Sequence, residues 1–228
     1  MEFSIKDKKI TVFGSEEPGV PVVYLNTVHG EGEAVWEACR KKGCPPFTLA
    51  AISGLLWEQD MSPWAVPPIS PNDMPFTGGA DDYLTLLTSE IVPAVENELA
   101  EKPSVRALAG YSLAGLFALY AAYRTVLFTK IASVSGSLWF PDFTEYVFSH
   151  QMKAELSGLY LSLGDKEAKT RNPYLRMVQK NTEQIAAHYK EQGLYTIFEQ
   201  NPGNHFQNPN ERTAAGIAWI LKEMTDTP

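Results

Sequence analysis

Continuous apolar runs of strand length alternate along this chain with segments of helical period, and this alternation constrains the fold most strongly. The apolar runs are residues 8–13, 20–26, 47–53, 105–110, 131–136, 159–164 and 195–200. Most of them lack polar alternation, which is typical of strands buried on both faces of a parallel sheet. The helical segments are residues 31–43, 80–102, 113–124, 173–193 and 210–224. This order predicts an α/β fold in which helices cover both faces of a mainly parallel, twisted sheet.

The 228 residues contain no linker and no internal repeat, so we expect one domain over residues 1–228. One stretch departs from the pattern, because residues 60–79 are dense in proline and carry Trp64. A long irregular segment inside a compact domain is usually functional, for example as a cover over a site. A segment that only covers one edge of the sheet would have the same composition, so both interpretations stay open.

The acidic balance of the chain, a formal net charge of −8, disfavours non-specific nucleic-acid binding, which needs lysine and arginine to neutralise phosphates. No apolar stretch is long enough to cross a bilayer, so we expect no membrane insertion. The first residues do not resemble a secretory signal. Cys39 and Cys44 form neither a CxxC motif nor a disulfide framework, and we expect reduced thiols in a cytoplasmic protein.

The sequence has no HExxH motif and no clustered histidine and aspartate spacing of the kind that holds a metal. We therefore expect neither a metal nor a cofactor, and a small molecule as the binding partner. The number of subunits has no signature in the sequence, which leaves a homo-oligomer open.

The stretch GYSLAG carries the strongest chemical signal, since a serine lies between small residues after an apolar strand and before an apolar helix. Gly110, Ser112 and Ala114 take the places of glycine, serine and a small residue in the G-x-S-x-G nucleophile elbow. The elbow holds its serine on a strained turn above the sheet, and the flanking positions must be small to avoid a collision. Ala114 replaces the second glycine of the strict pattern, and Gly115 follows it.

A serine nucleophile needs a base within hydrogen-bond reach, and the base needs an orienting acid. In this type of fold the chain order is serine, acid, histidine. His188 lies in the middle of a polar helical segment, whereas His205 lies in NPGNHFQNP, a loop that follows the last strand. We therefore predict His205 as the base.

The acid should follow the preceding strand, where the loop DKEAKTRN offers two carboxylates. Asp165 lies in the turn itself, and its side chain is suited to bond the turn backbone. Glu167 lies beyond the turn and reaches further, so it is the preferred acid, with Asp165 as the alternative.

The oxyanion of acyl transfer needs two backbone donors. The first is expected to be the N–H of Leu113, and the second the N–H of Thr27 or Val28 after an earlier strand. The side chains expected to line a substrate site are His29, Trp64, Tyr111 and Trp139. A solvated His29 and a tryptophan buried in the core are equally ordinary alternatives.

Several motifs in the right order resemble the esterase D-type branch of the α/β-hydrolases, which includes enterochelin (siderophore trilactone) esterases, feruloyl esterases and S-formylglutathione hydrolases. The motifs are YLNT followed by GEG, FTGGADDYL, EIVP, GYSLAGLFALY, SVSGSLWF, LSLGDKE and GNHF. They span nearly the whole chain.

This resemblance implies an α/β-hydrolase fold without a large cap domain. It implies that Ser112 is the nucleophile, His205 the base and Glu167 the acid. It also implies that Trp139 lies at the rim of the site and that residues 60–79 cover it. The expected site loops offer few cations, chiefly Lys166, Lys169 and Arg171, which disfavours a triply anionic catecholate as substrate.

These observations together predict a serine carboxylester hydrolase that acts on a small-to-medium ester through an acyl-enzyme intermediate. Specialisation towards a siderophore trilactone, a feruloyl ester or a thioester is an alternative. A ligand-binding protein that keeps the fold without catalysis is another, since fold alone does not imply activity.

Overall fold

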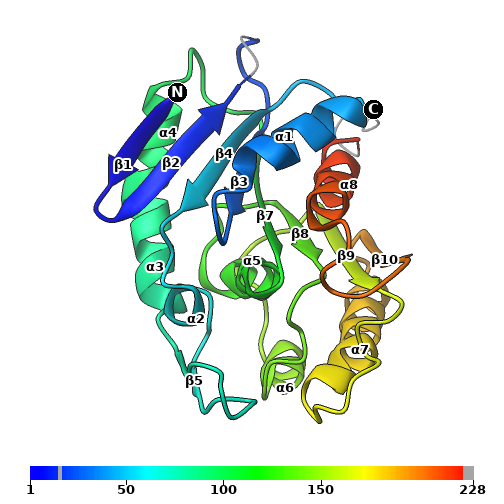
Figure 1. Ribbon diagram of the computed structural model, residues 1–228. Coiled ribbons are helices and arrows are strands. Elements are labelled where there is room, and N and C mark those ends of the chain that lie inside the picture. The colour runs from blue at the N-terminus through cyan, green and yellow to red at the C-terminus, as the bar shows by residue number, and fades with distance from the viewer. Residues whose placement is uncertain (15–16, 223–228) are drawn as a thin grey trace.

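The computed structural model describes residues 1–14 and 17–222 and places an eight-stranded sheet at its centre (Figure 1). The strand order across the sheet is β1-β2-β4-β3-β7-β8-β9-β10. These strands are β1 (Glu2–Ile5), β2 (Lys8–Phe13), β3 (Val22–Asn26), β4 (Thr48–Ser53), β7 (Arg106–Tyr111), β8 (Lys130–Val134), β9 (Gly158–Gly164) and β10 (Thr196–Asn201).

The sheet is parallel from β4 to β10 and antiparallel at the edge that β1 and β2 form. The central strands β3, β8 and β9 are buried along their whole length, as their continuous apolar composition predicts. The predicted α/β fold with a mainly parallel sheet is confirmed. A single domain over residues 1–228 stays a prediction, because residues 15–16 and 223–228 lie outside the described residues.

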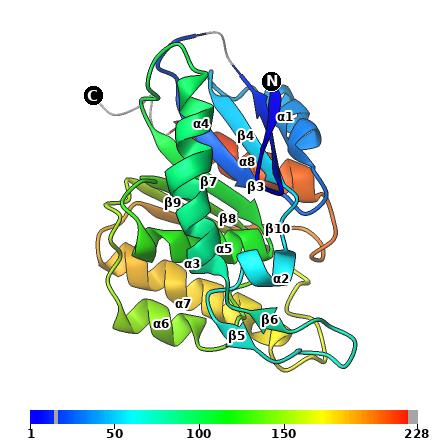
Figure 2. The same cartoon turned by 90° about the vertical axis from the view of Figure 1, so that its left-hand side faces the viewer.

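Helices cover both faces of the sheet (Figures 1 and 2). The helices α1 (Gly32–Lys41) and α8 (Pro209–Lys222) pack together on one face, over a core that includes Val35 and Ile217. The other face carries α3 (Ala80–Leu86), α4 (Val92–Asn97), α5 (Leu113–Arg124), α6 (Phe143–Ser149) and α7 (Val178–Glu191). None of the helices in the described ranges has the length and apolar character needed to traverse a bilayer.

The predicted helix over residues 80–102 is interrupted before its proline. A π-helical turn (Leu87–Ile91) joins α3 to α4, and Pro93 lies in the first turn of α4. Proline donates no hydrogen bond, and it is tolerated at a helix start, where the amide lacks an intrahelical partner in any case. The widened turn therefore lets the chain continue past Pro93. Residues 223–224 of the last predicted helix lie outside the described residues.

The proline-rich segment is more ordered than its composition predicts. After the short helix α2 (Trp57–Asp60), the strands β5 (Ala65–Val66) and β6 (Phe76–Thr77) pair as an antiparallel ribbon. Phe76 is buried, and its ring packs against those of Trp139 and Phe140. This packing fixes the segment over the carboxyl ends of the parallel strands, the edge of an α/β sheet where ligands bind.

Candidate active site

Ser112 occupies the turn between β7 and α5 with a backbone φ of 60° and ψ of −123°. A positive φ is uncommon for serine and costs free energy unless the surroundings impose it. Here the Ser112 N–H donates to the carbonyl oxygen of Val134 at 3.1 Å. The Ser112 carbonyl oxygen accepts from the amides of Leu116 and Ser137 at 3.1 and 3.0 Å. These bonds anchor the strained turn on both sides.

Small residues permit this turn, as the elbow pattern predicts. A Cβ atom on Gly110 would lie 2.3 Å from the backbone carbon and oxygen of Ala114. Ala114 is itself fully buried, and a Cβ on Gly115 would lie 2.9 Å from the Cα of Gly136. The alanine in place of the second glycine is thus accommodated, while Gly115 provides the close approach to the next loop.

The contact at Gly110 gives a stability prediction. Gly110→Ala should lower the free energy of unfolding by about 1–3 kcal/mol or more. The new methyl group would overlap backbone atoms of Ala114 that cannot move independently. Urea unfolding followed by circular dichroism measures the effect. Gly158→Ala is the matched control, since its Cβ would meet the Trp219 ring at an ordinary 3.4 Å. Equal stability of the two variants would contradict this account.

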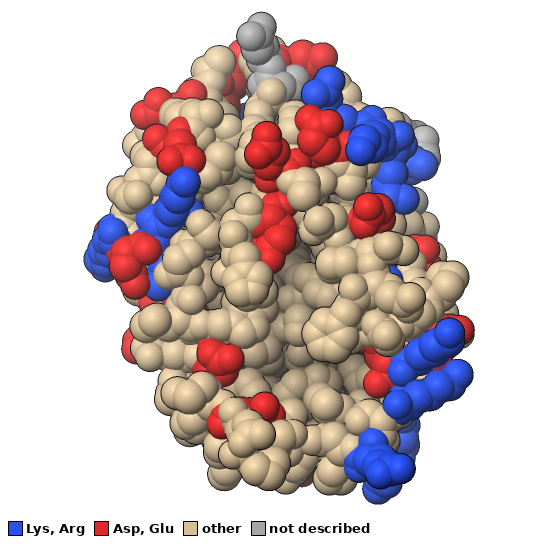
Figure 3. Space-filling view, viewed as in Figure 1, with Lys and Arg blue, Asp and Glu red and all other residues tan. Residues whose placement is uncertain are grey.

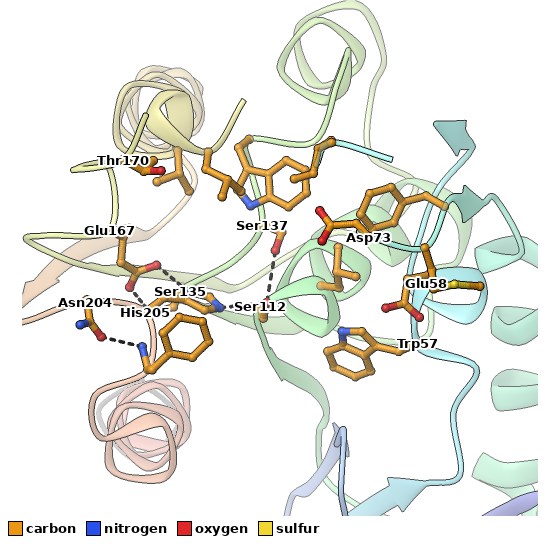
Figure 4. Close-up of a pocket in the computed structure, with 18 of the residues that line it drawn as sticks. Trp57, Glu58, Asp73, Ser112, Ser135, Ser137, Glu167, Thr170, Asn204 and His205 are labelled. Carbon is orange, nitrogen blue, oxygen red and sulfur yellow. Dashed lines mark hydrogen bonds and ion pairs between the residues drawn. The ribbon is translucent and has the colours of Figure 1, made fainter. Parts of the chain in front are cut away.

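Three side chains from separate loops meet at the carboxyl edge of the sheet (Figure 4). The Ser112 Oγ lies 3.0 Å from Nε2 of His205. The His205 Nδ1 lies 2.7 Å from Oε2 of Glu167. Glu167 follows β9 and His205 follows β10, so the structure brings together the serine, histidine and preferred acid that the sequence predicts.

Glu167 is held by more than the histidine. Its Oε1 accepts from the Ser135 Oγ at 2.8 Å, from the Gly164 N–H at 2.6 Å and from the Arg212 guanidinium at 3.1 Å. Its side chain is only 4% exposed. Burial alone would raise the pKa of Glu167, but the hydrogen bond and electrostatic interaction with His205, with the bonds from Gly164 and Ser135, bring it below the ordinary value. The carboxylate is therefore held ionised.

Asp165, the alternative acid, bonds the backbone of a neighbouring loop and not the imidazole of His205. Asp165 is exposed, and its carboxylate accepts the N–H of Gly203 at 2.6 Å across the two loops. That bond joins the loop after β9 to the loop that carries His205. Asp165 therefore supports the loop of the histidine, and the carboxylate in contact with the imidazole belongs to Glu167.

The backbone amides expected as oxyanion donors differ in their hydrogen bonding. Leu113 begins α5, and its N–H is one of those that a helix start leaves without an intrahelical partner. The Thr27 N–H donates to the carbonyl oxygen of Ile52 at 2.9 Å, which removes Thr27 as a free donor. The Val28 N–H has no hydrogen bond within the described residues, so Val28 is the remaining candidate of the two.

A cavity of about 780 Å³ opens beside the serine, and Trp139, Trp57 and Phe76 contribute aromatic walls. Residues 69, 72–74 and 76 line it too, so the proline-rich segment does border the site.

The other predicted lining residues are not part of this wall. Trp64 donates its indole N–H to the Pro141 carbonyl and packs among the rings of Tyr120, Phe140, Phe143 and Tyr146. The Tyr111 hydroxyl donates to the His205 carbonyl oxygen at 2.7 Å and thereby holds the histidine loop. His29 is exposed in the loop after β3. The predictions for Trp64, Tyr111 and His29 as cavity residues are therefore corrected.

Several polar groups of the site have no individual signal in the sequence. Ser135 and Arg212 bond Glu167, and Ser137 lies beside Ser112. Arg212 is 4% exposed and also bonds the Tyr111 hydroxyl, the Ser135 hydroxyl and the Pro202 carbonyl. The one available signal is the SGS stretch directly after β8, since polar residues at the carboxyl ends of parallel strands tend to face a site.

Charges of both signs border the cavity. Glu58 and Asp73 lie on the side of Ser112 opposite to His205 and Glu167 (Figure 4). Lys166 and Lys169 line it from the loop after β9. Figure 3 shows that the hollow in this face is bordered mainly by uncharged residues, with basic side chains gathered at the lower right. The structure describes no group of three or more His, Cys, Asp or Glu placed to hold a metal within residues 1–14 and 17–222.

A mainly parallel sheet with helices on both faces and a serine on the tight turn between a strand and a helix is the architecture of the α/β-hydrolases. The chain belongs to the family described as "Putative esterase", whose model matches residues 56–207. This membership supports hydrolysis of an ester as the activity of the chain.

Individual proteins are also similar to this chain in sequence or in fold. The uncharacterized protein YbbA of Bacillus subtilis is 25% identical over 94% of this chain and 91% of its own length. The siderophore hydrolase EstA from Aspergillus nidulans superposes with a TM-score of 0.77 at 19% identity, over 100% of this chain and 94% of that one. An IroE-like serine hydrolase from Shewanella oneidensis gives 0.74 at 20% identity, over 94% and 76%. At these identities the two structures show a shared fold.

Proposed function

We propose that this chain is a serine carboxylester hydrolase that works through an acyl-enzyme on Ser112. The proposal rests on two hydrogen bonds of His205, one between its Nε2 and the Ser112 Oγ and one between its Nδ1 and the Glu167 carboxylate. A carboxylate at Nδ1 keeps the imidazole proton on that nitrogen, which leaves the Nε2 lone pair to accept the serine proton.

Acylation begins when the Ser112 Oγ attacks the ester carbonyl carbon and His205 takes its proton. Negative charge then develops on the carbonyl oxygen, where the amides of Leu113 and Val28 are the proposed donors. His205 returns the proton to the alcohol oxygen as the C–O bond breaks. In deacylation a water attacks the acyl carbon, with His205 again as base, and Ser112 is released.

The cavity favours a small-to-medium ester with an apolar or aromatic part. About 780 Å³ falls within the usual range for small-molecule sites, and Trp57, Phe76 and Trp139 offer rings for contact. Because Glu58 and Asp73 border the same space as Lys166 and Lys169, a polyanionic ester would meet repulsion on one side.

A siderophore ester is the second candidate, because solved structures named as siderophore and enterobactin esterases share the fold. Initial rates on a panel of aryl acetates, feruloyl esters, catecholate trilactones and formylglutathione would separate these substrate classes. Labelling by a fluorophosphonate separates any such enzyme from a non-catalytic ligand-binding protein, which should not react covalently.

The two tryptophans should respond differently to substitution. Trp139→Ala should raise the KM for an aryl ester by about 2- to 12-fold, the equivalent of 0.5–1.5 kcal/mol of lost ring contact, because its ring lines the cavity. Trp64→Phe, the control, keeps a ring in the core and should leave KM unchanged while losing about 1 kcal/mol of stability with its bond to Pro141. Steady-state kinetics and thermal unfolding test the pair. A larger KM effect from Trp64 would contradict this arrangement.

A further inference from the structure

Ser137 carries a buried hydroxyl beside the nucleophile whose role the proposed mechanism does not yet use. Its side chain lines the cavity, and the residue is 2% exposed. Within the described residues its hydroxyl has one partner, the Ser112 Oγ at 3.4 Å. Hydroxyl hydrogen bonds are ordinarily about 2.7–2.8 Å long, so this contact leaves most of the bonding capacity of the group unused. The buried Ser137 hydroxyl can therefore form a hydrogen bond with a further oxygen atom in the cavity.

The backbone fixes the place of this hydroxyl without help from the side chain. The Ser137 N–H donates to the Ser112 carbonyl oxygen at 3.0 Å. Ser135 has a positive φ of 43°, and a Cβ on Gly136 would lie 2.2 Å from the Ser133 Oγ. The tight SGS turn therefore presents the Ser137 side chain to Ser112 whether or not the two hydroxyls bond.

The sheet order says which side of the nucleophile Ser137 occupies. Strand β7, which ends before Ser112, lies between β3 and β8. The proposed donor Val28 follows β3, whereas Ser137 follows β8 and His205 follows β10. The strands before Ser137 and His205 thus lie on the same side of β7, and Figure 4 shows the Ser137 hydroxyl directed at Ser112. In the proposed mechanism the leaving alcohol departs and the attacking water arrives beside His205, since His205 exchanges protons with both.

We propose that the Ser137 hydroxyl binds the oxygen atom that His205 protonates or deprotonates. This inference rests on the proposed serine esterase mechanism. In acylation the Ser137 O–H donates to the alcohol oxygen while the bond from that oxygen to the acyl carbon breaks and His205 delivers its proton. In deacylation the water gives one proton to His205 and directs the other at the Ser137 oxygen, which accepts it as a hydrogen bond while the new C–O bond forms. A hydroxyl suits both steps because it donates and accepts.

The test is the Ser137→Ala variant with two acetates that differ in leaving group. Ethoxide is strongly basic and needs the positioned proton, whereas p-nitrophenolate leaves readily without one. The value of kcat/KM should fall by about 10- to 100-fold for ethyl acetate, the effect of one hydrogen bond to a group that carries charge, and by less than about 3-fold for p-nitrophenyl acetate. The lifetime of the acetyl-enzyme, followed by mass spectrometry, should rise by a factor similar to that for ethyl acetate.

Two further variants separate this role from packing. Ser137→Cys keeps the volume of the side chain but forms weak hydrogen bonds, so it should resemble Ser137→Ala. Ser133→Ala removes another buried hydroxyl of the same segment, which has no partner within the described residues, and should resemble the wild type. Equal losses for both acetates in Ser137→Ala, or recovery in Ser137→Cys, would overturn the inference. A wild-type chain that hydrolyses neither acetate and takes no fluorophosphonate label would instead overturn the proposed function.

Discussion

Ser112→Ala should reduce the hydrolysis of p-nitrophenyl acetate by at least about 10⁴-fold and abolish covalent labelling by a fluorophosphonate. Removal of the nucleophilic serine costs about 10⁶-fold in kcat in a protease of another fold that uses a Ser-His-Asp set of catalytic groups. The loss should be nearly complete because the Ser112 Oγ, 3.0 Å from Nε2 of His205, is the proposed atom of bond formation.

The fold should survive this substitution. Alanine keeps the Cβ atom, and the bonds that anchor the elbow involve only the backbone of Ser112. Circular dichroism and a melting curve close to those of the wild type would confirm this. Ser149→Ala, an exposed serine of α6, is the control and should retain full activity. A Ser112→Ala variant that still hydrolyses the ester at the wild-type rate would contradict the proposed mechanism.

Glu167→Gln should lower kcat by about 10⁴-fold, the cost of forcing a catalytic histidine into the wrong tautomer. The Glu167 Oε1 accepts from Ser135, Gly164 and Arg212, so an amide at this position must turn its oxygen towards these three donors. Its NH₂ group then faces Nδ1 of His205. That nitrogen has to accept, which moves the imidazole proton to Nε2 and blocks transfer from Ser112.

Asp165→Asn is the matched control, because it removes the other carboxylate of the same loop. Its bond to the Gly203 N–H should weaken by about 1 kcal/mol at most, and kcat should stay within about 3-fold of the wild type. Single-turnover and steady-state rates of both variants distinguish Glu167 from Asp165 as the acid that orients His205. A large loss in Asp165→Asn beside a small one in Glu167→Gln would assign the acid to Asp165 instead.

The sequence predicted the sheet well because parallel strands buried on both faces have an unambiguous composition. It did not predict β1, whose residues alternate between half-buried and exposed at the antiparallel edge. It also did not predict α6, a helix of only seven residues with too few turns for a clear period. The break before α4 depended on how the chain accommodates Pro93, which composition leaves undecided.

The candidate site was predictable where chain order carries information. The order of Ser112, Glu167 and His205 along alternating strands and helices follows from the chemistry of the fold. Thr27 was misplaced as a donor because its amide extends the pairing of β3 with β4 by one residue, and only the register shows this. Trp64 was misplaced because its partner Pro141 lies 77 residues away in the chain.

The contacts of Arg212 have a consequence for the way the protein is made. Its guanidinium joins Tyr111 at the end of β7, Ser135 after β8, Glu167 after β9 and Pro202 after β10. Synthesis runs from the N-terminus, so His205 and Arg212 leave the ribosome after Ser112 and Glu167. A nascent chain that ends at β9 therefore contains Ser112 without His205 and without the Arg212 bonds that join four strand ends. Under the proposed mechanism, hydrolytic competence arises late in translation, when α8 docks on the sheet.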